Sequence, residues 1–204
     1  ASEEMLKLSE EAYEKAVAEK KAEGRKTVKL GYFSGSITHN DDFILIQPAV
    51  AKIMEKYPQT ELHIAGILDI PKEFEAFKER VIAHPFADWK KLPEMIASMD
   101  INLAPLEESI FNEAKSENKW VEAALVRVPT IASNLGAFKR MIEHNKTGIL
   151  ANTCEEWYEG LEALIVDTQK RECIAKAAYD YCKVHCVTLY TGFPLMKFIK
   201  SMYV

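Results

Sequence analysis

The stretch FNEAKSENKWVEAALVRVPTIAS, residues 111–133, decides the fold of this chain. Its composition predicts a polar loop and then a helix over Glu117–Arg127, which Pro129 ends. Residues 130–132 then form a short apolar run that predicts a buried strand, which ends at Ser133. A helix that leads directly into a buried strand is typical of a parallel sheet covered by helices.

One face of this helix carries the residues that suggest chemistry. Lys115, Lys119 and Glu122 follow the i, i+4, i+7 spacing, so we expect them to share a face, and Ser116 is placed to cap the helix. Lysines beside a helix amino terminus suit a phosphate, because free backbone N–H groups point the same way. A carboxylate two turns along can accept hydrogen bonds from the vicinal hydroxyls of a ribose. The alternative is a solvated Lys/Glu face on an ordinary surface helix.

Composition limits the classes of protein to consider. The chain has 204 residues, 48% of them apolar, and a net charge of −5, which favours one domain with a substantial core. It has no basic cluster that would suit a nucleic acid or a membrane surface. It also has no apolar run long enough for a membrane span and no recognisable signal peptide.

The cysteines favour a cytoplasmic protein with free thiols. All four lie in the last quarter of the chain, which is not the pattern of a secreted disulfide framework. Cys182, His185 and Cys186 form a C-x-x-H-C pattern that lacks a fourth ligand, so we expect buried helical cysteines and no metal site.

Outward from the opening stretch, strands and helices alternate with short connections. We expect an α/β protein with a Rossmann-like parallel sheet and helices on both faces. In such sheets, ligands bind at the carboxyl ends of the strands. The predicted strands are residues 28–33, 61–67, 80–83, 100–104, 130–132 and 147–150, and the loops that follow them and could enclose a nucleotide are 34–40, 66–70, 84–89 and 107–119.

The two ends of the chain differ from its middle. Residues 1–26 predict a helix with so thin an apolar stripe that we expect it to link the domain, residues 27–186, to a preceding one. Residues 187–204 predict a short apolar helix that packs toward that missing amino-terminal domain. A helix is also predicted up to Tyr57, with Pro48 either kinking it or lying in its first turn near Gln47.

Several motifs, taken in order, resemble the carboxy-terminal half of the group 1 (family 4) glycosyltransferases, which have the GT-B architecture. The resemblance covers about residues 27–170, and the motifs look most like those of capsule, rhamnan and S-layer glycan transferases. The motifs are GYFSGSITHNDDF (31–43), YPQTELHIAG (57–66), HPFADWKKLPEMIASMDINLAPL (84–106), the opening stretch (111–133) and KTGILANTCEEWYEGLEALIVD (146–167).

This resemblance implies a nucleotide-diphosphate-sugar site. Glu122 would hold the ribose, Lys115 and Lys119 would assist departure of the diphosphate, and the base would lie beside residues 84–86. The implied binding residues are Gly35, Ser36, Thr38, His39, Gly66, His84, Pro85, Phe86, Ser116 and Glu122, beside the catalytic pair Lys115 and Lys119.

The chain departs from the family pattern at two places. Ser36 and Asn40 or Asp41 stand where the family usually has an Arg and a Lys, and Ala114 stands where the first acid of the E-x7-E pair belongs. Glu113 is adjacent to that position. The phosphate charge would therefore rest on the two lysines, with a contribution from His39.

The function that the resemblance implies is transfer of a sugar from a UDP-, GDP- or dTDP-sugar to a glycan, lipid-linked or other hydroxyl acceptor, with retention. No cofactor or metal is implied, and the acceptor site belongs to the missing amino-terminal domain, so we expect little turnover by this chain alone.

One alternative is a non-catalytic domain of Rossmann-like or flavodoxin-like type that binds a nucleotide or FMN. NAD is disfavoured because no G-x-G-x-x-G follows the first strand. Another is a protein-interaction module that exposes Met5–Ala16 and Phe193–Tyr203.

Overall fold

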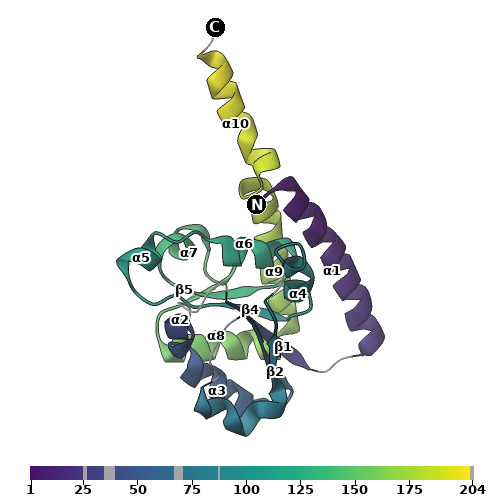
Figure 1. Cartoon of the computed structure of the whole chain (residues 1–204), viewed down its shortest axis with the longest axis vertical. Helices are drawn as coiled ribbons and strands as arrows, with labels where there is room; N and C mark the ends of the chain where they lie inside the picture. The colour runs from purple at the N-terminus through teal and green to yellow at the C-terminus, as the bar shows by residue number, and fades with distance from the viewer. Residues whose placement is uncertain (25–26, 35–39, 67–70, 87, 203–204) are drawn as a thin grey trace.

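A parallel sheet forms the centre of the computed structural model, which describes residues 1–24, 27–34, 40–66, 71–86 and 88–202 (Figure 1). The sheet has six strands in the order β3-β2-β1-β4-β5-β6, and all of its pairings are parallel. This confirms the predicted fold class. The strands are β1 (Val28–Phe33), β2 (Thr60–Ala65), β3 (Val81–His84), β4 (Ile101–Ala104), β5 (Thr130–Ser133) and β6 (Ile149–Ala151).

Helices cover both faces of the sheet. One face packs on α3 and α8 through a core that includes Tyr32, Ile53 and Leu161, and the other packs on α1, α4, α6 and α9 around Trp120. The helices are α1 (Glu3–Glu23), α2 (Asn40–Ile44), α3 (Gln47–Lys56), the 3-10 helix η2 (Lys72–Arg80), α4 (Leu92–Ala97), α5 (Ile110–Glu113), α6 (Asn118–Leu125), α7 (Gly136–Met141), α8 (Cys154–Val166), α9 (Thr168–His185) and α10 (Thr188–Ser201).

Proline and capping residues account for most helix boundaries. The helix predicted up to Tyr57 is two helices, and Pro48 lies in the first turn of α3, which was one of the two predicted alternatives. Thr153 and Glu156 form a capping box at the start of α8, and Asp167 caps α9.

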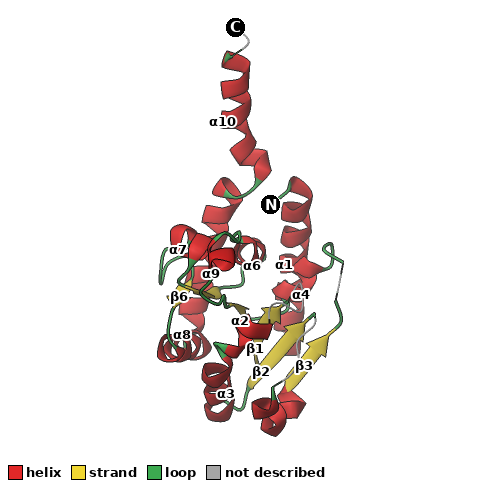
Figure 2. Cartoon of the chain, turned by 60° about the vertical axis from the view of Figure 1, so that its left-hand side comes forward, coloured by secondary structure: helices red, strands yellow, loops and turns green. Residues whose placement is uncertain are grey.

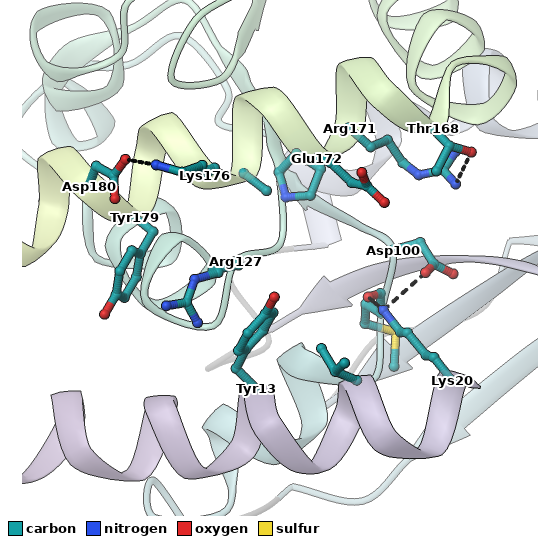
Figure 3. Close-up of a pocket in the computed structure, with 14 residues that line it drawn as sticks. Tyr13, Lys20, Asp100, Arg127, Thr168, Arg171, Glu172, Lys176, Tyr179 and Asp180 are labelled. Atoms are coloured by element: carbon teal, nitrogen blue, oxygen red, sulfur yellow. Dashed lines mark hydrogen bonds and ion pairs between the residues drawn. The ribbon is translucent and has the colours of Figure 1, made fainter. Parts of the chain in front are cut away.

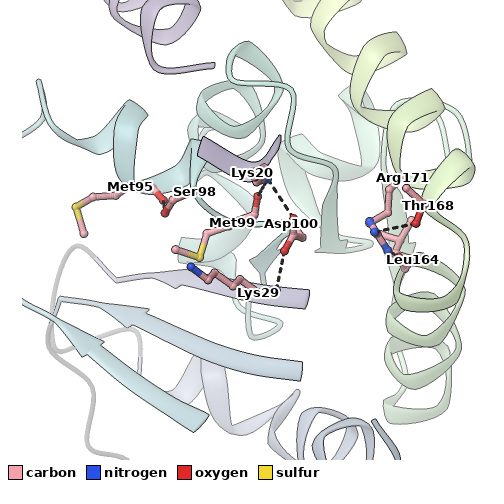
Figure 4. A network of polar contacts seen from close by, with 9 residues as sticks. All are labelled: Lys20, Lys29, Met95, Ser98, Met99, Asp100, Leu164, Thr168 and Arg171. Atoms are coloured by element: carbon pink, nitrogen blue, oxygen red, sulfur yellow. Dashed lines mark hydrogen bonds and ion pairs between the residues drawn. The ribbon is translucent and has the colours of Figure 1, made fainter. Parts of the chain in front are cut away.

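Helix α1 is tied to the amino-terminal ends of two strands (Figure 4). The Asp100 carboxylate, just before β4, accepts a hydrogen bond from the Lys29 backbone N–H (2.8 Å) and pairs with Lys20 Nζ (3.1 Å). Lys20 also donates to the Met99 carbonyl at 2.8 Å. With Ala12 and Ala16 buried, α1 therefore packs as part of this body.

Helix α10 extends away from the rest of the molecule (Figures 1 and 2). It runs through Gly192, and its apolar side chains Phe193, Leu195 and Phe198 are between 61% and 67% exposed. None of the helices described is long and apolar enough to cross a membrane.

Candidate functional site

The order of the strands reverses between β1 and β4, so the loops after these two neighbours leave the sheet in opposite directions. Polar groups are buried at this carboxyl end, among them Ser34, Asp42, Asn112 and Ser133. Ser133 Oγ accepts a hydrogen bond from the Leu106 backbone N–H at 2.8 Å, which fixes the chain as it leaves β4. The sheet therefore presents a polar site where ligands bind in this class of fold.

The start of α6 differs from the prediction. Glu117 precedes the helix and makes no capping hydrogen bond through its side chain, and Ser116 is exposed two residues before the helix begins, so the predicted Ser116 cap is wrong. The reason is the short helix α5, which Ser109 caps by accepting from the Asn112 N–H at 3.1 Å. Since α5 occupies residues 110–113, the chain turns before it can enter α6.

Lys115 consequently lies in the connection between α5 and α6, and the prediction that it shares a helical face with Lys119 and Glu122 is wrong. It still reaches the site, because its Nζ lies 3.6 Å from Oδ2 of Asp42. The Asp42 side chain is only 2% exposed, and its Oδ1 accepts from the backbone N–H of Glu107 (2.8 Å) and from Nδ2 of Asn112 (3.3 Å). Asp42 thus joins the helix after β1 to the loop after β4.

Asp42 is the residue that sequence reasoning missed. Nothing in an isolated carboxylate reveals partners that lie 65 and 70 positions away in the chain. The only local signal was its place in the motif that follows the first strand.

Lys119 lies in the first turn of α6, with its ammonium buried against the sheet. Its Nζ is 5.1 Å from the centroid of the Tyr32 ring and has no hydrogen-bond partner among the residues described. The pKa of Lys119 is lowered to about 8, mainly by burial and also by the charge of Lys115, and the charges of Asp42 and Glu122 oppose this shift. An ammonium that is buried without a hydrogen-bond acceptor is costly, and an anionic ligand would remove that cost.

Glu122 follows one turn later on α6. Burial raises the pKa of its carboxyl, while the charge of Lys119 and the amino terminus of the chain lower it. Asn102, buried on β4, fixes this turn of α6 by donating to the Lys119 carbonyl (3.2 Å) and to Thr130 Oγ1 (3.0 Å).

The predicted base-binding residues lie at the ends of β2 and β3. The His84 imidazole Nε2 is 2.9 Å from His63 Nδ1, and the other nitrogen of His63 is 3.0 Å from Glu61. Burial lowers the pKa of both histidines, so a neutral pair is favoured. Pro85 and Phe86 are exposed, Phe86 at 72%.

Gly66 lies where β2 ends against the start of the loop after β1. Its φ is +103°, and a Cβ there would be 2.0 Å from the Ser34 carbonyl oxygen, so only glycine fits. Gly35, Ser36, Thr38 and His39 lie outside the described residues. Two cavities, of about 660 and 290 Å³, open at the opposite, amino-terminal ends of the strands. The candidate site at the carboxyl ends is therefore identified by its buried charged groups and not by either of these cavities.

The family model "Glycosyl transferases group 1" matches residues 29–167. No curated protein sequence matches significantly.

Three solved structures illustrate the likeness of fold. Anabaena HepE in complex with UDP has a TM-score of 0.75 and 19% sequence identity, and the match covers 94% of this chain and 55% of the HepE chain. The carboxy-terminal domain of Francisella tularensis LpcC, a group 1 family glycosyl transferase, has a TM-score of 0.58 and 21% identity over 78% of this chain and 86% of its own. Sucrose-phosphate synthase from Thermosynechococcus elongatus has a TM-score of 0.63 and 12% identity over 87% of this chain and 46% of its own. The chain thus spans about half the length of the HepE structure.

Proposed function

The chain belongs to the group 1 glycosyl transferases, and from this membership we propose that it is the donor-binding half of an enzyme that transfers a sugar from a nucleotide diphosphate to a hydroxyl acceptor. The acceptor would be a glycan or a lipid-linked molecule. The four free thiols suit the reducing cytoplasm.

The observation that carries the proposal is the buried ammonium of Lys119, which has no hydrogen-bond acceptor among the described residues and lies at the carboxyl end of the sheet. A diphosphate would supply oxygen acceptors for it. Lys115 would add a second positive charge, because its distance of 3.6 Å from Asp42 leaves its N–H donors available to a ligand.

In the reaction, the bond between the anomeric carbon of the sugar and the diphosphate oxygen breaks, and its electron pair stays on that oxygen. The acceptor hydroxyl forms the new bond to the anomeric carbon, and its proton passes to the departing diphosphate or to water. Negative charge therefore grows on the diphosphate, and the two lysines, already in place, stabilise it. Retention of configuration is the outcome that the family implies.

Glu122 would accept hydrogen bonds from the ribose hydroxyls, and the base would lie beside the ends of β2 and β3. Among the three candidate nucleotides UDP, GDP and dTDP, UDP is our first choice, since the HepE structure holds UDP. The acceptor site would be provided by a preceding domain, and we expect this chain alone to bind donor with little turnover.

Ligand-induced stabilisation tests the proposal. We expect UDP, GDP or dTDP to raise the melting temperature, because a ligand that binds only the folded state stabilises it in proportion to RT ln(1 + [L]/Kd). Lys119→Met should weaken binding by about tenfold or more, the effect of losing a charge-assisted hydrogen bond. Lys139→Met, which changes an exposed lysine on α7, should bind as the wild type does. The proposal fails if no nucleotide raises the melting temperature, or if FMN alone does.

A further inference from the structure

A second site lies at the opposite end of the sheet, in the cavity of about 660 Å³ between α1 and α9 (Figure 3). It opens beside Asp100 and Pro129, which precede β4 and β5, and its volume is in the range of small-molecule sites. The proposed donor site does not use it, because Lys119 and Glu122 lie at the other end of the strands.

Arg127 is fixed in this cavity by two aromatic rings. Its guanidinium carbon lies 4.0 Å from the centroid of the Tyr13 ring, on α1, and 3.8 Å from that of Tyr179, on α9. Figure 3 shows Arg127 between these two rings, so cation–π contacts hold its side chain in place. The Arg127 guanidinium makes no hydrogen bond or ion pair with any residue that the structure describes, and only the backbone N–H of Arg127 is bonded, to the Ala124 carbonyl at 3.0 Å.

The other cations of the cavity already have partners. Lys20 pairs with Asp100, and Lys176 pairs with Asp180 at 2.5 Å. Arg171 donates to the backbone carbonyls of Leu164 and Ile165 and to the Thr168 hydroxyl, contacts that hold the junction of α8 and α9. Within the described part of the chain, Arg127 is therefore the cation of this cavity whose charged group has neither a hydrogen-bond partner nor an ion-pair partner.

A nearby acid does not neutralise Arg127 by direct pairing. Glu10 accepts hydrogen bonds from the Tyr179 hydroxyl (2.7 Å) and from Lys183 Nζ (2.8 Å), so those two groups hold its carboxylate.

The backbone at Arg127 is unusual as well. Its φ is +54°, just after the end of α6, where chains favour glycine or asparagine because a side chain disfavours this conformation. An arginine is present here in spite of that strain, and its side chain lies between the two rings.

Tyr13 supplies a further unused polar group. Its hydroxyl has no hydrogen-bond partner among the described residues, and Figure 3 shows the ring directed from α1 toward α9, next to Arg127. The rest of the lining is mixed, with apolar Val17, Met99 and Ala175 and with the carboxylate of Glu172. Such a lining suits one anionic group on an otherwise neutral body and disfavours a polyanion.

We propose that this cavity binds a small polyhydroxylated molecule with a single phosphate or carboxylate group, and that the Arg127 guanidinium and the Tyr13 hydroxyl hold this oxyanion. The planar fork of arginine matches both oxyanions through paired hydrogen bonds. Sugar phosphates and sugar acids have this chemistry.

The test is a calorimetric titration of the whole chain with glucose 6-phosphate, with glucuronate and with neutral glucose, at matched ionic strength. We expect saturable binding of at least one of the two anions and none of glucose, and the comparison of the two anions identifies the preferred group. Arg127→Gln should weaken that binding by about tenfold or more, and Tyr13→Phe, which keeps the stacked ring and removes only the hydroxyl, by about threefold to tenfold.

Two further variants keep the outcome specific. Arg140→Gln removes an exposed arginine on α7 and should leave binding unchanged. Lys119→Met removes a cation of the donor site and should also leave it unchanged, so that failure here is distinguishable from failure of the proposed function. Binding that survives both Arg127→Gln and Tyr13→Phe, or that is lost with Lys119→Met, would overturn the proposal, as would no binding of either anion. If Arg127→Gln does not fold, Tyr13→Phe alone decides.

Discussion

The Lys115 ammonium lies 3.6 Å from the buried carboxylate of Asp42, and this pair joins segments that follow two neighbouring strands, β1 and β4. The carboxylate also accepts hydrogen bonds from Glu107, which precedes α5, and from Asn112, which lies within α5. A single acidic side chain thus positions the connection from which Lys115 extends toward the proposed donor.

Replacing Asp42 by asparagine should lower the free energy of unfolding by about 1–3 kcal/mol, because charge-assisted hydrogen bonds become neutral ones. The neighbouring Asp41 is exposed and provides the matched control, since Asp41→Asn should change stability by less than about 0.5 kcal/mol. Urea denaturation of both variants measures the difference. Equal stabilities would show that the Asp42 contacts contribute nothing net.

Lys119→Met should stabilise the chain in the absence of ligand while it weakens nucleotide binding. The substitution replaces a buried ammonium that lacks an acceptor with an apolar group of similar length, and we expect a gain of about 1–3 kcal/mol at pH 7. Lys139→Met should be nearly neutral. A Lys119→Met protein less stable than the wild type would mean that the ammonium is stabilised by its surroundings.

The advantage of Lys119→Met should shrink as pH rises. The pKa of Lys119 is about 8 in the folded state and near its usual value of about 10.4 in the unfolded state. Between these two pH values the unfolded chain binds more protons than the folded chain, so the stability of the wild type increases with pH over this range. The change is about 3 kcal/mol at most by pH 10. Urea midpoints of the two proteins at pH 7, 8.5 and 10 measure it, and a constant difference would show that the pKa is not lowered.

Gly66→Ala should destabilise the chain by at least about 2 kcal/mol, because a left-handed backbone and contact with the Ser34 carbonyl both oppose a Cβ. Gly192→Ala is the control, since a Cβ there meets nothing within 4 Å and the residue is helical. That substitution should be stabilising by about 0.5–1 kcal/mol. Thermal unfolding of the two variants should therefore shift in opposite directions.

The sequence predicted the strands well because each is a short segment, either apolar or with apolar and polar residues interspersed, that is ended by glycine, proline or polar residues. It failed at Ser116, because α5 forms from the segment that looked like a loop once Ser109 caps it. It also missed Asp42 and the stacking of Arg127, since both depend on contacts between segments far apart in the chain. The burial of Lys119 depends on Tyr32, nearly ninety residues earlier, and periodicity within one helix carries no record of it.

The projecting helix α10 has a consequence for dynamics. Isolated helices of this length are marginal in water, and the apolar side chains that would anchor α10 are mostly uncovered, unlike those of α9. Protection of backbone amides against hydrogen exchange should therefore fall sharply after Val187, although both sides of that residue are helical.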